Sequence, residues 1–313
     1  MKYHWLLVLM SLTAVACDPG AGAEVRTLTP LDGTYNQEVS YVSFGDSIVA
    51  GYCGWYCQDD SYAVHLSQSL AERDDLRVNY FGRGESGATM TEIADTVESN
   101  TELLEKADIV TIEGCGNDYL DARDEYLAQT DCTDGRLIAR ALEACKINMT
   151  RAMREITIHA KPTAQVLVMT LYYPTVLQDK SSKCGNTSHF DLFLPFLIES
   201  NWWTCNEAWK RGYECVDAMS VMNAADIDRD ANLIIDSEQI RMQASVDENN
   251  ILNYQARMAN NRSVLADGHD KIDASSIPDD YMQSDSKHPS QQGHQGLAAE
   301  HLKLLRRTVP PAL

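Results

Sequence analysis

The sequence has few basic residues. Lys and Arg number 26 of 313 residues, against 46 Asp and Glu, which gives a formal net charge of −20. Proteins that bind nucleic acid cluster Lys and Arg against the phosphates, so this balance argues against a nucleic-acid partner. The excess of acidic residues is typical of a well-solvated surface.

Long hydrophobic runs are missing beyond the first 16 residues, so the rest of the sequence predicts no membrane span. At the start, Lys2 precedes a short apolar run and then small residues up to Ala16-Cys17. This layout is typical of an export signal. Cleavage after Ala16 would leave Cys17 at the N-terminus, which resembles a bacterial lipoprotein signal with an acylated cysteine, although Ala14 stands where such signals usually have Leu. The alternative is ordinary secretion.

Residues 18–36 follow this signal and show no hydrophobic periodicity. We therefore expect a signal peptide over residues 1–16, a tether over 17–36 and one folded domain over 37–313. The protein is expected to be exported. It would be either a lipoprotein of the bacterial cell envelope, reaching the membrane only through its N-terminal lipid, or a secreted protein.

No set of cysteines and histidines has the spacing of a zinc site, so the nine cysteines are expected to serve other purposes. With Cys17 used for the lipid, eight remain, an even number that suits disulfides in an oxidising compartment. Local spacing favours the pairs Cys53–Cys57 and Cys132–Cys145. Cys184, Cys205 and Cys215 are expected to share one cross-linked region. Cys115 is hard to place.

Short apolar strands alternate with helical patterns after residue 37, which predicts an α/β fold. We expect a single domain with three layers, α/β/α, around a central parallel sheet of about five strands. The expected strands cover residues 41–44, 77–81, 108–112, 165–171 and 215–219, and the expected helices cover 61–73, 135–159 and 291–306.

Two segments, 176–212 and 223–284, have weak periodicity and are long for loops, so we expect lids or insertions there. The first contains a group of aromatic residues near three cysteines. These residues predict either a lipid-facing lid or acyl pocket, or a small satellite core packed around disulfides.

The most informative motif is Phe44-Gly45-Asp46-Ser47, which closes the apolar run 39–43. A strand that ends in Gly-Asp-Ser and then turns into a helix presents the Ser47 hydroxyl at the carboxyl edge of a sheet. Ligands bind at this edge in open α/β sheets. The motif therefore marks a candidate functional site.

Three other turn-rich segments follow in order: residues 82–89, residues 114–118 and residues 285–289. Together with the Gly-Asp-Ser turn they resemble the SGNH (GDSL-type) hydrolase family, in particular its secreted, disulfide-bearing esterase and lipase branch. The four residues that name the family fall on Ser47, Gly87, Asn117 and His288. The sequence departs from the family pattern at Gly82, near a usual Asn, and at Cys115, where the family usually has Gly. The resemblance implies the flavodoxin-like SGNH fold.

The residue types also predict a mechanism. Ser47 needs a base to take its proton, and His288 suits this role because imidazole titrates near neutral pH. Asp285 lies three residues earlier and is expected to orient the imidazole. The resemblance implies that the oxyanion hole is formed by the backbone N–H groups of Ser47 and Gly87 and by the side-chain amide of Asn117.

We therefore expect an exported serine esterase or lipase that forms an acyl-enzyme on Ser47, acts as a monomer on a small-molecule or lipid ester, and needs no cofactor. Two alternatives remain open at this point. One is an acyltransferase or deacetylase that acts on surface glycans, and the other is a catalytically silent binding module.

A weaker motif lies in the second insertion. Asp226, Asp228 and Asp230 alternate in the manner of a calcium loop, but Ala231 replaces the turn glycine and Glu238 falls one position late. Calcium is therefore a secondary hypothesis, against an ordinary acidic loop. His294, near the proposed base, is expected to cap a helix.

Overall fold

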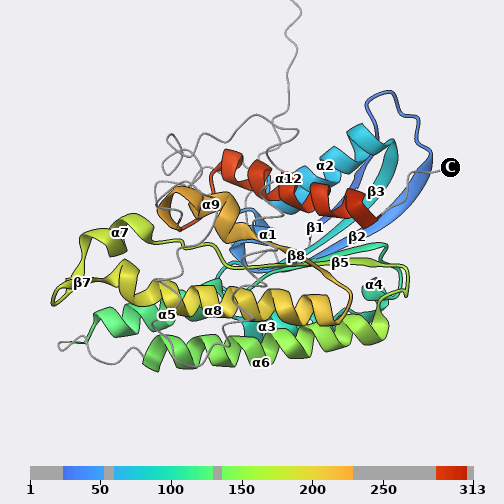
Figure 1. Cartoon of the computed structure of the whole chain (residues 1–313). Coiled ribbons are helices and arrows are strands. Elements are labelled where there is room, and N and C mark those ends of the chain that lie inside the picture. The colour runs from blue at the N-terminus through green and yellow to red at the C-terminus, as the bar shows by residue number, and fades with distance from the viewer. Residues whose placement is uncertain (1–23, 53–59, 130–135, 228–286, 309–313) are drawn as a thin grey trace, which may run out of the picture.

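A six-stranded sheet forms the middle layer of the computed structural model, which describes residues 24–52, 60–129, 136–227 and 287–308 (Figure 1). The strand order is β1-β3-β2-β4-β5-β8. The strands are β1 (Glu24–Leu28), β2 (Gln37–Gly45), β3 (Leu76–Gly84), β4 (Ile109–Ile112), β5 (Gln165–Met169) and β8 (Glu214–Val216). All neighbours pair in parallel except β1, which pairs antiparallel with β3. The predicted α/β fold with a central parallel sheet of about five strands is confirmed, with the difference that a sixth strand, β1, joins the edge in antiparallel orientation.

The central strands are hydrophobic on both faces because helices cover both. All four residues of β4 are buried, as are the last five of β2. Continuous burial of this kind is expected where crossover helices pack on each side of a parallel sheet. The carboxyl ends of β3, β2 and β4 therefore open beside one another, at the edge where a ligand site is expected.

Two layers of helices cover the sheet (Figure 1). The first layer contains α3 (Met90–Ser99), α5 (Gly116–Leu127), α6 (Arg136–His159) and α8 (His189–Lys210). The second contains α2 (Tyr62–Asp74), α9 (Ala218–Ile227) and α12 (Gln291–Thr308). Shorter elements complete the described chain: α1 (Ser47–Ala50), α4 (Thr101–Leu104), α7 (Val176–Ser181) and the hairpin of β6 (Lys183–Cys184) and β7 (Thr187–Ser188). Each layer has its own apolar core against the sheet.

The expected lid over 176–212 is wrong. Most of this segment is α8, a helix of 22 residues that packs against α6 and contributes to the core of the first layer. Its N-terminal half is buried on most sides, including Phe190, Phe193 and Leu197. A helix that is apolar on most of its circumference lacks the stripe by which a surface helix is recognised. Its aromatic residues thus belong to the main core, neither to a lipid-facing lid nor to a satellite core.

The expected tether over 17–36 is also wrong in part, because residues 24–28 form the edge strand β1. The strand has alternating exposure, as expected of an edge, and five residues are too few to show that period clearly in the sequence. The second expected insertion begins inside a helix, since α9 ends at Ile227. The signal peptide, with Cys17, lies outside the described residues. No helix among the described residues is long and apolar enough to cross a bilayer.

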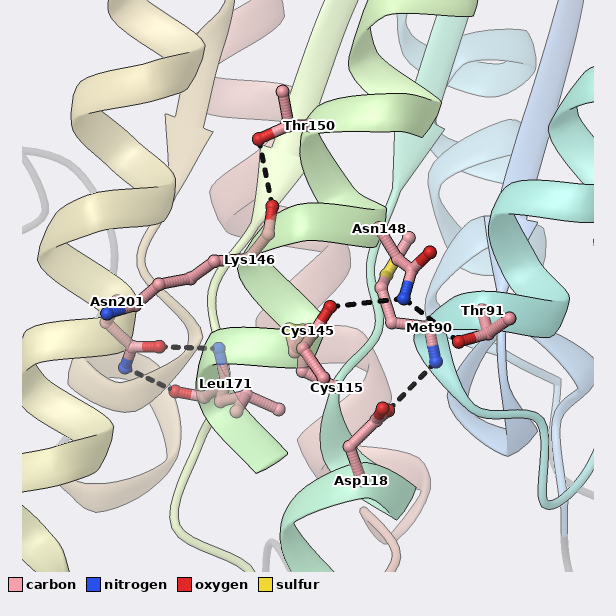
Figure 2. Close-up of a disulfide and its surroundings, with 11 residues drawn as sticks. Met90, Thr91, Cys115, Asp118, Cys145, Lys146, Asn148, Thr150, Leu171 and Asn201 are labelled. Atoms are coloured by element: carbon pink, nitrogen blue, oxygen red, sulfur yellow. Dashed lines mark hydrogen bonds between the residues drawn. A yellow bond between two sulfur atoms is a disulfide. The ribbon is translucent and has the colours of Figure 1, made fainter. Parts of the chain in front are cut away.

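The disulfides differ from the sequence prediction at one pair. Cys145 bonds to Cys115 and not to Cys132, and the bond joins the start of α5 to α6 (Figure 2). Cys205 bonds to Cys215, as expected for cysteines that share one region. The prediction failed because Cys115 follows β4 and lies beside α6 only in the folded sheet. Cys53, Cys57 and Cys132 lie outside the described residues.

Candidate active site

The candidate nucleophile lies in the turn between β2 and α1. Asp46 caps α1, because its Oδ1 accepts a hydrogen bond of 2.9 Å from the Ile48 N–H. Ser47 is the first residue of α1 and is 6% exposed. The strand, the glycine and the cap together hold the Ser47 side chain at the carboxyl edge of the sheet.

His288 lies directly before α12, and its ring reaches the nucleophile turn. The His288 Nε2 atom lies 2.9 Å from the Ser47 Oγ atom, which is hydrogen-bond distance. The Tyr52 ring lies 4.4 Å from the imidazole, centroid to centroid. The Tyr172 hydroxyl donates to the carbonyl oxygen of Lys287 at 2.6 Å. The histidine is therefore held through its ring and through the backbone beside it.

The other two motif segments meet next to this pair. Gly87 lies after β3 with φ of 85°, a left-handed conformation that favours glycine. Asn117 lies at the start of α5, after β4, and its Nδ2 donates to the Ala88 carbonyl at 2.9 Å and to Asp46 Oδ2 at 3.3 Å. Asn117 thus connects the Gly87 loop to the nucleophile turn.

A second bond ties the same two loops together. Asp118 Oδ2 accepts from the Met90 N–H at 2.8 Å, as Figure 2 shows beside the Cys115–Cys145 disulfide. Cys115 itself has φ of 76°, a conformation that non-glycine residues rarely adopt. The disulfide therefore anchors an unusual backbone turn immediately before Asn117.

Two buried carboxyl groups lie beneath the turn. Asp46 is 3% exposed and Glu113, directly after β4, is 4% exposed. Burial raises the pKa of both, and for Glu113 the neighbouring Asp46 raises the pKa further. Burial also raises the pKa of Asp118.

The structure brings together four of the predicted site residues: Ser47 and His288 in direct contact, and Gly87 and Asn117 on adjoining loops. Asp285 lies outside the described residues, so its role stays a prediction. Sequence reasoning missed Glu113, Tyr172 and Tyr52. Only Glu113 had a visible signal, because an acid at the end of the apolar strand 109–112 is unusual.

The secondary hypotheses fare differently. Asp226 belongs to the last turn of α9, while Asp228 and Asp230 lie outside the described residues, so calcium remains a prediction. In the part of the chain that the structure describes, no three acidic, His or Cys side chains are grouped to hold a metal. His294 caps a helix, as expected, but not the helix in which it lies. It is buried within α12, and its Nδ1 accepts a hydrogen bond of 3.2 Å from the N–H of Tyr62, the first residue of α2.

The mostly parallel sheet between two helical layers agrees with the SGNH fold that the motifs indicated. Residues 43–189 match the model of the GDSL-like lipase/acylhydrolase family. The chain therefore contains a GDSL-like lipase/acylhydrolase domain and belongs with the carboxylic ester hydrolases, as the motifs indicated. No curated protein matches the sequence.

Solved structures share the fold. A lipase from a goat rumen metagenome superposes with a TM-score of 0.55 at 17% identity, covering 86% of this chain and 96% of its own. A variant of Axe2, an acetyl-xylooligosaccharide esterase from Geobacillus stearothermophilus, has a TM-score of 0.52 at 15% identity, covering 88% of this chain and 96% of its own. At these identities the likeness concerns the fold alone.

Proposed function

We propose that the protein is an exported serine esterase that hydrolyses carboxylic esters through an acyl-enzyme on Ser47. The observation that carries this proposal is the 2.9 Å contact between His288 Nε2 and Ser47 Oγ. Ser47 Oγ attacks the ester carbonyl carbon while its proton moves to His288 Nε2. The resulting tetrahedral intermediate collapses, and the imidazolium returns that proton to the departing alkoxide, which leaves as the alcohol. In the second half of the reaction, water attacks the acyl carbonyl carbon while its proton moves to His288 Nε2. The intermediate then collapses, the imidazolium returns the proton to Ser47 Oγ, and the carboxylic acid is released.

The oxyanion of the intermediate needs donors that are already aimed at it. The backbone N–H groups of Ser47 and Gly87 and the Asn117 amide are the proposed donors. Their assignment is supported by the hydrogen bonds from Asn117 to the Gly87 loop and to Asp46. Gly87 suits this role because an added Cβ meets no neighbouring atom within 4 Å, so the space beside its backbone is open to a substrate.

Export is proposed on independent grounds. The signal-like start of the sequence and the two disulfides agree with an oxidising compartment. Lipid attachment at Cys17 is tested by metabolic labelling with a radioactive fatty acid. Label incorporated into the wild type and not into Cys17→Ala supports the anchor, and a wild type without label supports plain secretion.

The activity is tested with p-nitrophenyl esters of increasing acyl length and with acetylated xylo-oligosaccharide. The wild type should hydrolyse at least one of them, and Ser47→Ala none. Ser99→Ala, which changes an exposed serine at the end of α3, is the matched control and should keep full activity. Full activity in Ser47→Ala would overturn the proposal.

A fluorophosphonate probe separates this proposal from a silent binding module. The probe should label the wild type and the Ser99→Ala control but not Ser47→Ala. A folded wild type that neither reacts with the probe nor hydrolyses any ester would favour the binding module.

A further inference from the structure

The carboxyl group of Glu113 is built into the nucleophile turn. Its Oε1 accepts a hydrogen bond of 2.7 Å from the Asp46 N–H, and its own N–H donates to the Phe44 carbonyl at 3.1 Å. A Cβ placed on Gly45 would lie 2.0 Å from that same Oε1. The space that a side chain at position 45 would need is therefore filled by Glu113, which explains why the turn requires glycine there.

The Glu113 and Asp46 carboxyl groups are neighbours inside this turn. Glu113 Oε1 is bound to the Asp46 backbone, both side chains are buried, and the two groups shift each other's pKa. Two buried carboxyl groups this close disfavour each other's charge, so a single proton held by the pair is the favoured state.

The surroundings decide which carboxyl group keeps the proton. Asp46 accepts from the Ile48 N–H through Oδ1 and from the Asn117 amide through Oδ2, and the Ser47 hydroxyl lies 3.5 Å from Oδ1. Donors on both oxygens stabilise the ionised form of Asp46. Its other titratable neighbours are Asp118, whose negative charge raises the pKa of Asp46, and His288, whose positive charge when protonated lowers it.

Glu113 has a less favourable environment for a charge. It faces the Asp46 carboxylate, whose charge disfavours a second negative charge. Its other titratable neighbour, Tyr62, has a pKa raised well above the ordinary value and is neutral. Burial raises the pKa of Glu113 well above its ordinary value, with Asp46 as the next cause.

We propose that Glu113 is a positioning residue that stays protonated at neutral pH, donates a hydrogen bond to the Asp46 carboxylate, and so fixes the Ser47 turn while keeping a single negative charge beside it. The charge matters because Asp46 Oδ2 and the oxyanion would both bind the Asn117 amide. A proton on Glu113 draws charge from Asp46 and leaves the amide freer for the oxyanion.

Glu113→Gln is the decisive variant because a glutamine amide reproduces the protonated acid: its oxygen accepts from the Asp46 N–H and its NH₂ donates to the carboxylate. Urea unfolding is followed from pH 5 to 9 in the Ser47→Ala background. This stability measurement requires no catalysis. A negative result for Glu113 can therefore be distinguished from a negative result for the proposed esterase function. The positioning role of Glu113 rests on that proposed function.

The sign of the expected effect follows from proton linkage. The unfolded chain ionises Glu113 above about pH 4.3, whereas the folded chain keeps the proton, so unfolding releases one proton. The unfolding constant of the parent should therefore rise about tenfold per pH unit relative to that of Glu113→Gln, until the folded carboxyl group ionises. Glu102→Gln, an exposed acid in α4, is the control and should show no such slope.

If the unfolding constants of the parent and of Glu113→Gln kept the same ratio across this pH range, Glu113 would be ionised in the folded protein, and the proposal would be overturned.

Activity is measured separately, in the protein that retains Ser47. Glu113→Gln should keep kcat/KM within about threefold of the wild type, since its contacts are retained. Glu113→Met keeps the volume but neither contact, and should lower kcat by on the order of 10²-fold with KM little changed. If Glu113→Gln lost as much kcat as Glu113→Met, the protonated form would not be the working one.

Discussion

The two helical layers deliver different halves of the site and hold them by different means. The first layer presents Asn117 from α5, and a disulfide at Cys115, two residues earlier, ties the start of that helix to α6. Arg151 of α6 also bonds to Asp95 and Glu98 of α3, the helix that follows the Gly87 loop. The second layer presents His288 ahead of α12, where contacts are polar and aromatic. The loop of Asn117, a proposed oxyanion donor, is therefore anchored by a covalent cross-link, whereas the sequence around His288, the proposed base, contains no cysteine.

The second layer also buries titratable groups. Burial lowers the pKa of His294 to about 3 and that of His301 to about 4, so both are neutral when folded. The His301 ring stacks on Tyr62 of α2 at 4.6 Å. The comparison thus predicts that the first layer is sensitive to loss of its disulfide and the second to acid.

The largest expected effect comes from removing the base. His288→Ala should lower kcat by on the order of 10⁶-fold, because Ser47 then has no group to take its proton. Steady-state hydrolysis of an activated ester measures the loss. His159→Ala, at the far end of α6, should be silent. A His288→Ala protein with near-wild-type turnover would show that the second layer does not supply the base.

Removing a donor from the first layer should cost less. Asn117→Ala is expected to lower kcat by about 10²–10³-fold and leave a measurable remnant, since two backbone donors persist. The effect should fall on kcat with KM little changed. A loss confined to KM would place Asn117 in substrate binding and remove it from the oxyanion hole.

The disulfide of the first layer is tested next. The pair Cys115→Gly with Cys145→Ala should lower the free energy of unfolding by about 2–4 kcal/mol and also reduce kcat, because the turn before Asn117 loses its anchor. Glycine at position 115 accepts the positive φ, so the variant removes the cross-link without straining the backbone.

The second disulfide supplies the matched control for that experiment. Cys205→Ala with Cys215→Ala should cost stability, because it also opens a cross-link, but should leave kcat unchanged at temperatures where the protein is folded. The free energy of unfolding is measured by urea unfolding, and kcat is measured from initial rates. Equal losses of kcat in the two double variants would show that the Cys115 cross-link has no special effect on the site.

The smallest expected effect on activity comes from acid and the second layer, where the change is one of stability. The folded pKa of His294 lies far below its ordinary value of 6.5, so unfolding takes up a proton as the pH falls through 6.5. The wild type should then lose about 1.4 kcal/mol of stability per pH unit more than His294→Asn between pH 6 and 4. The buried His301 should likewise lower the stability of the folded protein as the pH falls. Parallel stability curves for the two proteins would contradict the buried neutral state.

The sequence contained much of this architecture, and its failures have physical causes. Ser47 was predictable because turn residues at a strand end mark the carboxyl edge of the sheet. His288 was predictable because the resemblance to SGNH hydrolases and the chemistry of imidazole both indicated it. The stripe of α6 was visible because one face of that helix is buried and the other exposed. By contrast, α8 has no clear stripe, and the partner of Cys145 depends on tertiary packing.

Glu113 illustrates the same limit more sharply. Its position after a buried strand was visible, but its role depends on a hydrogen bond to a residue 67 positions earlier. Only the pairing of β2 with β4 brings the two carboxyl groups into contact. The sequence therefore predicts the reacting groups better than the residues that hold them.

The central claim is that Ser47 is acylated with the help of His288. Rapid acid quenching of the enzyme during turnover of an activated ester, followed by mass spectrometry of the peptides, tests it most directly. The account predicts one added acyl group on the peptide containing Ser47, absent from Ser47→Ala and strongly reduced in His288→Ala. An active enzyme that is acylated on another residue, or never acylated, would contradict it.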